Sequence, residues 1–75
     1  MAADNAPAKF TAALVGRVLR LTLTNPQRLN AVDLATMAAL GDTVTAAADD
    51  ADVRAIVITG EGKAFCTGAD LSAIA

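Results

Sequence analysis

The residues of this chain that could do chemistry gather in one short segment, residues 59–70. The segment reads Thr-Gly-Glu-Gly-Lys-Ala-Phe-Cys-Thr-Gly-Ala-Asp and contains three glycines, one lysine and the only cysteine of the sequence. Glycines let a backbone approach a ligand closely, and a lysine beside them can neutralise a phosphate. The segment therefore invites a nucleotide-binding interpretation.

Neither common phosphate-binding loop fits that segment. A Walker A loop would need a glycine at Val57, five positions before Gly62, and a serine or threonine at Ala64. The cofactor loop of short-chain dehydrogenases would need further glycines at Ala64 and Cys66, and it follows the first strand of its fold. Both interpretations fail on the residues themselves.

Composition excludes several other kinds of site. The sequence has no histidine, so His-based proton transfer and His-ligated zinc sites cannot be built within it. With Cys66 as the only cysteine, an internal disulfide and a tetrathiolate site are also excluded, and we expect no metal. Six Lys and Arg against eight Asp and Glu give a net charge of −2, which argues against a nucleic-acid partner.

The hydrophobic residues predict a cytoplasmic protein with no membrane partner. They make up 55% of the 75 residues, but 19 residues are alanine and only two are phenylalanine, with no tyrosine or tryptophan. The N-terminus has no apolar run typical of a secretory signal, and the longest strongly apolar stretch is Ala55–Ile58. That stretch is far short of the ~20 residues that span a bilayer.

Periodicity and turn residues predict the elements that must position residues 59–70. Leu19, Leu21 and Leu23 alternate with polar residues, as in a half-buried strand, and Gly16 provides a turn to a strand before it. Asp33 is a candidate N-cap for a helix. We expect residues 1–8 to form a flexible tail. The expected order is strand, strand, helix and strand, at residues 9–15, 18–24, 33–48 and 53–59, with a loop over 27–32.

Two surfaces of these elements are expected in the core. One face of the helix carries Met37, Leu40, Val44 and Ala47 at helical spacing. The near-continuous apolar run Ala55–Ile58 is typical of a strand that is covered on both faces.

Two longer segments carry a pattern that is specific to one family. Residues 25–31 read Asn-Pro-Gln-Arg-Leu-Asn-Ala, and residues 52–71 read D-V-R, an apolar strand, then T-G-E-G-K-A-F-C-T-G-A-D-L. Both resemble the crotonases, the enoyl-CoA hydratase/isomerase superfamily, in sequence and in the spacing between them. The resemblance implies an α/β fold, namely the N-terminal ββαβ portion of the ClpP/crotonase spiral fold. Residues 1–8 would be a tail, and residues 9–75 a truncated part of the domain.

The resemblance also implies where an acyl-CoA thioester would bind. Crotonases use two backbone N–H groups to stabilise the oxyanion that forms when the thioester becomes enolate-like, and the pattern assigns one of them to Ala69. Gly68 would let the backbone approach the thioester without a Cβ clash. Coenzyme A enters as part of the substrate, so no separate cofactor is implied. Contacts with the CoA part are implied for Arg28, Ala31, Lys63, Ala64, Phe65, Thr67, Asp70 and Leu71.

Plainer roles stay open for several of these residues. Arg28 and Lys63 are equally compatible with solvated surface charges, and Asp70 with a helix cap. Cys66 is expected to be a packed small side chain, because no base is available to activate it as a nucleophile.

The rest of the family's catalytic groups lie downstream of this sequence. These are the second oxyanion donor and the acid–base glutamates, whereas Glu61 is the only glutamate here and has no catalytic role in the family. The expected function is an N-terminal fragment of an enzyme that hydrates 2-enoyl-CoA. It would supply half of the oxyanion hole and part of the CoA site, and would be inactive alone. The alternative is a stand-alone, non-catalytic module that binds CoA or a protein. Family members commonly form homotrimers or hexamers, and a partner chain would cover exposed strand edges.

Overall fold

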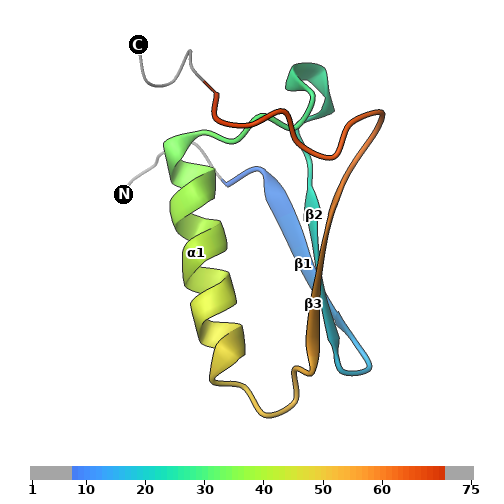
Figure 1. Cartoon of the computed structure of the whole chain (residues 1–75), viewed down its shortest axis with the longest axis vertical. Coiled ribbons are helices and arrows are strands. Elements are labelled where there is room, and N and C mark those ends of the chain that lie inside the picture. Colours follow the sequence, from blue (N-terminus) through green and yellow to red (C-terminus); the bar gives the residue numbers. More distant parts are fainter. Residues whose placement is uncertain (1–7, 71–75) are drawn as a thin grey trace.

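The computed structural model describes residues 8–70 as three strands, one α-helix and a short 3-10 turn (Figure 1). In chain order the elements are β1 (Phe10–Val15), β2 (Val18–Leu23), the 3-10 turn (Pro26–Arg28), α1 (Leu34–Ala48) and β3 (Ala55–Gly60). The predicted order of strand, strand, helix and strand is confirmed. The 3-10 turn is an addition at the start of the predicted loop. The tail predicted for residues 1–8 lies outside the described residues, apart from Ala8.

The three strands form one sheet in the order β1-β2-β3. β1 and β2 are antiparallel and join through a turn in which Gly16 has a φ of +62°, a backbone conformation that favours glycine. β3 runs parallel to β2, with Leu21 opposite Ile58, so the chain must cross over between them, and α1 makes that connection. Leu21 and Leu23 are buried in the central strand, as the alternating pattern predicts.

Helix α1 begins at a network that joins it to the start of β1. As predicted, Asp33 is its N-cap, and the carboxylate accepts a hydrogen bond from the N–H of Thr36 at 2.8 Å. Lys9 Nζ lies 2.6 Å from the same carboxylate, and the N–H of Lys9 donates to Thr36 Oγ1 at 3.1 Å. The hydrogen bonds from Lys9 and Thr36 lower the pKa of Asp33 from 3.8 to about 2.

No helix within residues 8–70 is long and apolar enough to cross a membrane.

The buried face of α1 agrees with the prediction only in part, since Ala47 is buried and Leu40 half-buried as expected. Thr36 and Ala47 are its buried residues, whereas Met37 and Val44 are 38% and 37% exposed. Thr36 accepts a hydrogen bond from the N–H of Lys9, so the side of α1 that faces the start of β1 carries Thr36 rather than Met37. Thr43 is half-buried on the same side and satisfies its hydroxyl by donating to the carbonyl of Ala39.

The prediction that β3 is covered on both faces is also wrong. Val57 is 44% exposed and Ile58 is 42% exposed. In the register of the sheet Val57 shares a face with Arg20, and among the described elements no layer covers that face. Ile58 shares the other face with Leu21, but the cavity between α1 and the sheet is lined by Leu14 of β1 and Leu19 of β2 and by no residue of β3.

Candidate functional site

The loops that follow β2 and β3 meet at one edge of the sheet, at the top of Figure 1. Parallel strands end at the same edge, and in α/β sheets the carboxyl ends of the strands are where ligands bind. We call residues 24–32 and 61–70 together the carboxyl edge. A hydrogen bond of 2.9 Å from the N–H of Glu61 to the carbonyl of Leu23 continues the pairing of β2 and β3 into it.

A short parallel bridge between Val32 and Ala69 defines the second part of the carboxyl edge. Val32 donates to the carbonyl of Gly68 at 2.9 Å and accepts from the N–H of Asp70 at 2.8 Å. In a parallel bridge of this kind, the N–H of the central residue points away from the partner. The N–H of Ala69 therefore faces outward, and within residues 8–70 it has no hydrogen-bond partner.

The residues just before Ala69 make weak contacts that support the Val32–Ala69 bridge. Gly68 has a φ of +114°, which side chains rarely adopt, and its N–H donates to Cys66 Sγ at 3.4 Å. Cys66 is half-buried. Thr67 Oγ1 lies 3.4 Å from the carbonyl of Leu29, across the carboxyl edge. A Cβ at position 68 would meet nothing within 4 Å, so lack of space is not the reason for glycine. The positive φ is what requires it.

Arg28 and Asp70 contact each other. Arg28 Nε lies 2.9 Å from Asp70 Oδ2, and Nη2 donates to Oδ1 at 3.1 Å, so the guanidinium binds the carboxylate through two parallel contacts. The Arg28 side chain remains about half exposed. Sequence reasoning assigned each residue to CoA and did not foresee the pair. The helix that Asp70 was expected to cap lies outside the described residues, as does Leu71.

The other predicted site residues of the carboxyl edge differ in their exposure. Lys63 and Phe65 are exposed, and within residues 8–70 Lys63 has no ion pair. Ala31 and Ala64 are half-buried, and the N–H of Ala31 donates to the carbonyl of Arg28. Among the predicted site residues that the structure describes, the side chains of Arg28 and Asp70 are brought into contact, and no hydrogen bond or ion pair joins Lys63 or Phe65 to the others.

Asn30 is the residue of this edge that sequence reasoning missed. It is 1% exposed, and its side chain makes three hydrogen bonds. Nδ2 donates to the carbonyls of Glu61 and Ala64 at 2.8 and 2.7 Å, and Oδ1 accepts from the N–H of Asn25 at 2.9 Å. Two signals for it are present in the sequence: Asn30 stands in the family pattern of residues 25–31, and asparagine tolerates the positive φ of a tight turn better than most residues do.

The chemistry available here is that of exposed N–H groups and a cation. No three His, Cys, Asp or Glu side chains in the described part of the chain could together hold a metal ion. Glu61 joins the edge through its backbone N–H and C=O, while the residue itself is exposed. The edge can therefore stabilise negative charge on an oxygen.

Comparison with known proteins gives consistent results. The sequence profile of the enoyl-CoA hydratase/isomerase family matches residues 15–75. The "probable enoyl-CoA hydratase EchA14" of Mycobacterium tuberculosis is 49% identical over 57 residues, which cover 76% of this chain and 22% of the relative. The 2,3-dehydroadipyl-CoA hydratase of Escherichia coli is 42% identical over 59 residues, which cover 79% of this chain and 23% of that enzyme.

Solved structures agree with the sequence comparisons. An enoyl-CoA hydratase from M. tuberculosis superposes with a TM-score of 0.84 at 30% identity, covering 88% of this chain and 30% of that one. A carnitinyl-CoA dehydratase from Mycobacterium avium superposes with a TM-score of 0.81 at 42% identity, covering 91% of this chain and 27% of that one. The chain thus spans less than a third of the length of these similar proteins.

Proposed function

Because the chain belongs to the enoyl-CoA hydratase/isomerase family and has the corresponding part of the crotonase fold, we propose that its carboxyl edge binds an acyl-CoA thioester. In this proposal the N–H of Ala69 is one of the two donors of the oxyanion hole. The reaction of the whole protein is the addition of water to a 2-enoyl-CoA. Three of the similar proteins are named as hydratases, which supports this choice within the family.

The observation that carries the proposal is the direction of the Ala69 N–H. The Val32–Ala69 bridge uses the carbonyl of Gly68 and the N–H of Asp70, so the Ala69 N–H is left to face outward from a fixed backbone. A preorganised donor of this kind contributes about 3–4 kcal/mol to stabilising an oxyanion in the transition state. An acyl oxygen placed against this N–H would gain that stabilisation without reorganising the loop.

The charged residues of the carboxyl edge suit the CoA part of the substrate. Lys63 is exposed and can pair with a phosphate directly. Arg28 already binds Asp70, so a CoA phosphate would have to share or displace that carboxylate. We therefore assign the stronger phosphate contact to Lys63 and the weaker one to Arg28.

We propose that the groups that transfer protons in the reaction are supplied by residues outside this chain. The sequence has no histidine, and its one glutamate, Glu61, enters the carboxyl edge through its backbone. We propose that this chain corresponds to the N-terminal part of its relatives, supplies half of the oxyanion hole and does not turn over substrate alone. Mixing the 75-residue chain with crotonyl-CoA should give no hydration above the rate in buffer, and turnover above that rate would contradict this part of the proposal.

Binding can be tested residue by residue. The full 15N-labelled chain is titrated with acetyl-CoA and, separately, with CoA, and backbone amides are followed by NMR. We expect the Ala69 amide proton to move downfield with acetyl-CoA and much less with CoA, because only the thioester supplies an acceptor oxygen. Equal responses to both ligands would favour the alternative function, a non-catalytic CoA-binding module. No response at Ala69 to either ligand would refute the oxyanion role.

A matched pair of variants tests the phosphate contact. Lys63→Gln should raise the dissociation constant of CoA about three- to tenfold and reduce its salt dependence, because one charge pair of roughly 1 kcal/mol is lost. Arg54→Gln removes the same charge at the opposite end of β3 and should leave the constant unchanged. Equal effects of the two substitutions would show only a general charge effect.

A further inference from the structure

Asn30 connects the two loops of the carboxyl edge. The donors of its Nδ2 group reach the carbonyls at both ends of the turn 61–64, and its Oδ1 closes the turn 25–30 by accepting from Asn25. Both donors of the amide are thus used on one loop and its carbonyl on the other. Among the described residues, no other buried side chain makes hydrogen bonds to both loops.

The space around Asn30 shows how closely the two loops approach. A Cβ placed on Gly60 would lie 2.8 Å from Asn30 Nδ2, 2.5 Å from the carbonyl oxygen of Ala64 and 2.3 Å from that of Phe65. The turn after β3 therefore folds back onto the end of its own strand. The amide of Asn30 occupies the inside of that fold, where water would otherwise have to satisfy the carbonyls.

The backbone at this point also explains the choice of asparagine. Leu29 and Asn30 both have positive φ values, 52° and 58°. Among residues with a side chain, asparagine is one of the few that adopt this conformation readily. Asn30 thus combines a backbone that can make the turn with an amide that can satisfy the two carbonyls.

We propose that Asn30 is a positioning residue for the oxyanion donor, an inference that rests on the proposed function. The segment 30–32 holds the loop 61–70 at two points, through the Asn30 side chain at Ala64 and through the Val32 backbone at Gly68 and Asp70. Residues 65–67 lie between these two anchors in the chain, and the N–H of Ala69 lies beside the second one. Without the Asn30 anchor, the loop would be held mainly by the Val32 bridge and the Arg28–Asp70 ion pair, so the N–H of Ala69 would be positioned less firmly.

Two substitutions at Asn30 separate its hydrogen bonds from its backbone role. Asn30→Asp keeps an acceptor for Asn25 and tolerates the positive φ, but it loses both donors to the loop. Asn30→Gly keeps the positive φ and loses all three bonds. Thr36→Val is the matched control, because Thr36 is also 1% exposed and also accepts a long-range hydrogen bond, from Lys9, but lies at the start of α1.

The decisive readout is backbone order in the full free chain, measured by 15N relaxation. For both Asn30 variants we expect order parameters over residues 61–67 to fall from about 0.85 to below about 0.6, with β2, β3 and α1 unchanged. Thr36→Val should lower the melting temperature and leave these order parameters unchanged. A folded Asn30→Asp variant with an ordered loop would overturn the inference. Global unfolding of Asn30→Asp but not of Thr36→Val would also overturn it, since the role would then be structural.

This readout does not depend on whether CoA binds, so failure of the proposed function is seen separately in the wild-type titration. Where the wild type binds acetyl-CoA, Asn30→Asp should raise the dissociation constant about tenfold or more and abolish the downfield shift of the Ala69 amide. Retention of that shift with unchanged affinity would contradict the positioning role.

Discussion

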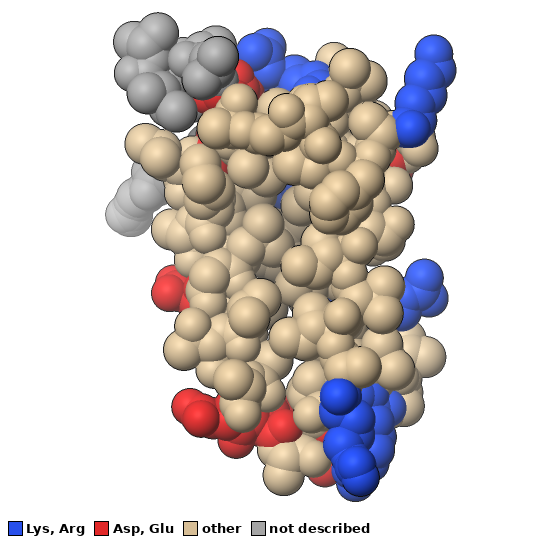
Figure 2. All heavy atoms as spheres, viewed as in Figure 1, with Lys and Arg blue, Asp and Glu red and all other residues tan. Residues whose placement is uncertain are grey.

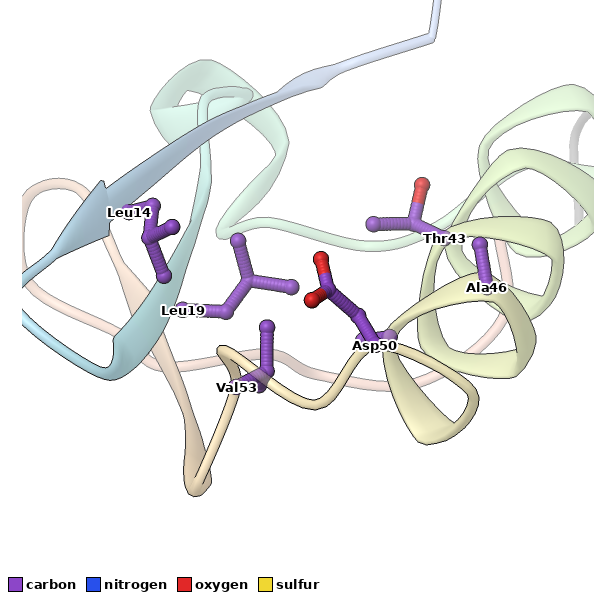
Figure 3. Close-up of a pocket in the computed structure, with 7 residues that line it drawn as sticks. Leu14, Leu19, Thr43, Ala46, Asp50 and Val53 are labelled. Atoms are coloured by element: carbon purple, nitrogen blue, oxygen red, sulfur yellow. The ribbon is translucent and has the colours of Figure 1, made fainter.

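The two ends of this small molecule are held together in different ways. At the carboxyl edge, the buried Asn30 amide, the Val32–Ala69 bridge and the Arg28–Asp70 ion pair join loops that are distant in sequence. At the opposite end, α1 faces β1 and β2 across an open cavity of about 240 Å³ (Figure 3). The residues that line it are Leu14, Leu19, Thr43, Ala46, Ala47, Asp50 and Val53.

The contrast shows that polar contacts, rather than side-chain packing, set the geometry of the candidate site. Only Leu21, Leu23 and Ala47 form the buried hydrophobic core of the described residues. The space-filling view shows a largely uncharged central surface, with charged groups at the two ends and along the left and right margins (Figure 2). A hydrogen bond stabilises the carboxyl edge through a single pair of atoms and needs no large apolar surface. The carboxyl edge can therefore be ordered although little apolar area is buried.

The largest expected effect tests whether the small core is essential. Leu21→Ala removes a side chain that is 0% exposed in the central strand and should lower the free energy of unfolding by about 3 kcal/mol. Leu14→Ala, on the half-open cavity wall, should cost less than about 1 kcal/mol because Leu14 is 52% exposed. Urea unfolding measures both values, and equal losses would remove the distinction between core and cavity.

The next effect tests the close approach in the carboxyl edge. Gly60→Ala would force a Cβ against the backbone carbonyls of Ala64 and Phe65 and should cost about 2 kcal/mol. Gly41→Ala is the matched control, because Gly41 lies inside α1 with nothing within 4 Å of a new Cβ. It should stabilise the protein by about 0.5–1 kcal/mol through helix propensity. A tolerated Gly60→Ala would show that the loop is looser than the contacts imply.

A smaller effect depends on pH and involves the cap of α1. Hydrogen bonds from Lys9 and Thr36 lower the pKa of Asp33 to about 2, so the unfolded chain binds a proton more tightly than the folded chain does. The stabilisation, about 1–2 kcal/mol, is fully present above about pH 4 and should be lost as the pH falls toward 2. Asp33→Asn still caps the helix but does not titrate there. Thermal melts of both proteins between pH 5 and pH 2 should differ in slope, and parallel curves would contradict the assignment.

The smallest effect concerns the cavity end. Ala46→Leu extends an exposed residue of α1 over the apolar walls formed by Leu14 and Leu19, and should stabilise the protein by about 0.5–1 kcal/mol. Ala48→Leu is the control, because two residues further along the helix the side chain points to the other side. Melting temperatures of the two variants decide the outcome. A gain of equal size in both would reflect helix propensity rather than filling of the cavity.

Local signals predicted the elements of this fold well. The alternation of Leu19, Leu21 and Leu23 predicted β2. The residue type of Asp33, just before a helical pattern, predicted the cap, and its hydrogen bond to Thr36 spans only three residues. The family pattern in residues 52–71 placed the site in the loop after β3. These features depend on neighbours in the chain, and the spacing of residue types records them.

Contacts between distant residues were not predictable in the same way. The buried side of α1 includes Thr36, whose hydroxyl accepts a hydrogen bond from the distant Lys9 N–H, whereas Met37 and Val44 are exposed. The pairing of Arg28 with Asp70 spans 42 residues and changes the environment of a cation that had been assigned to phosphate. Val57 and Ile58 are exposed because β3 is an outer strand of the sheet, and that position is likewise set by the topology.

The amino-acid sequence by itself determined the family, the order of strands and helix, and the segment that presents Ala69. It did so because motif residues and local periodicity are read directly along the chain. Only the tertiary structure decided which way the Ala69 N–H points and which residue joins the two loops. Both depend on the parallel pairing of β2 and β3, which brings two distant segments to the carboxyl edge, where the buried amide of Asn30 donates to the carbonyls of Glu61 and Ala64.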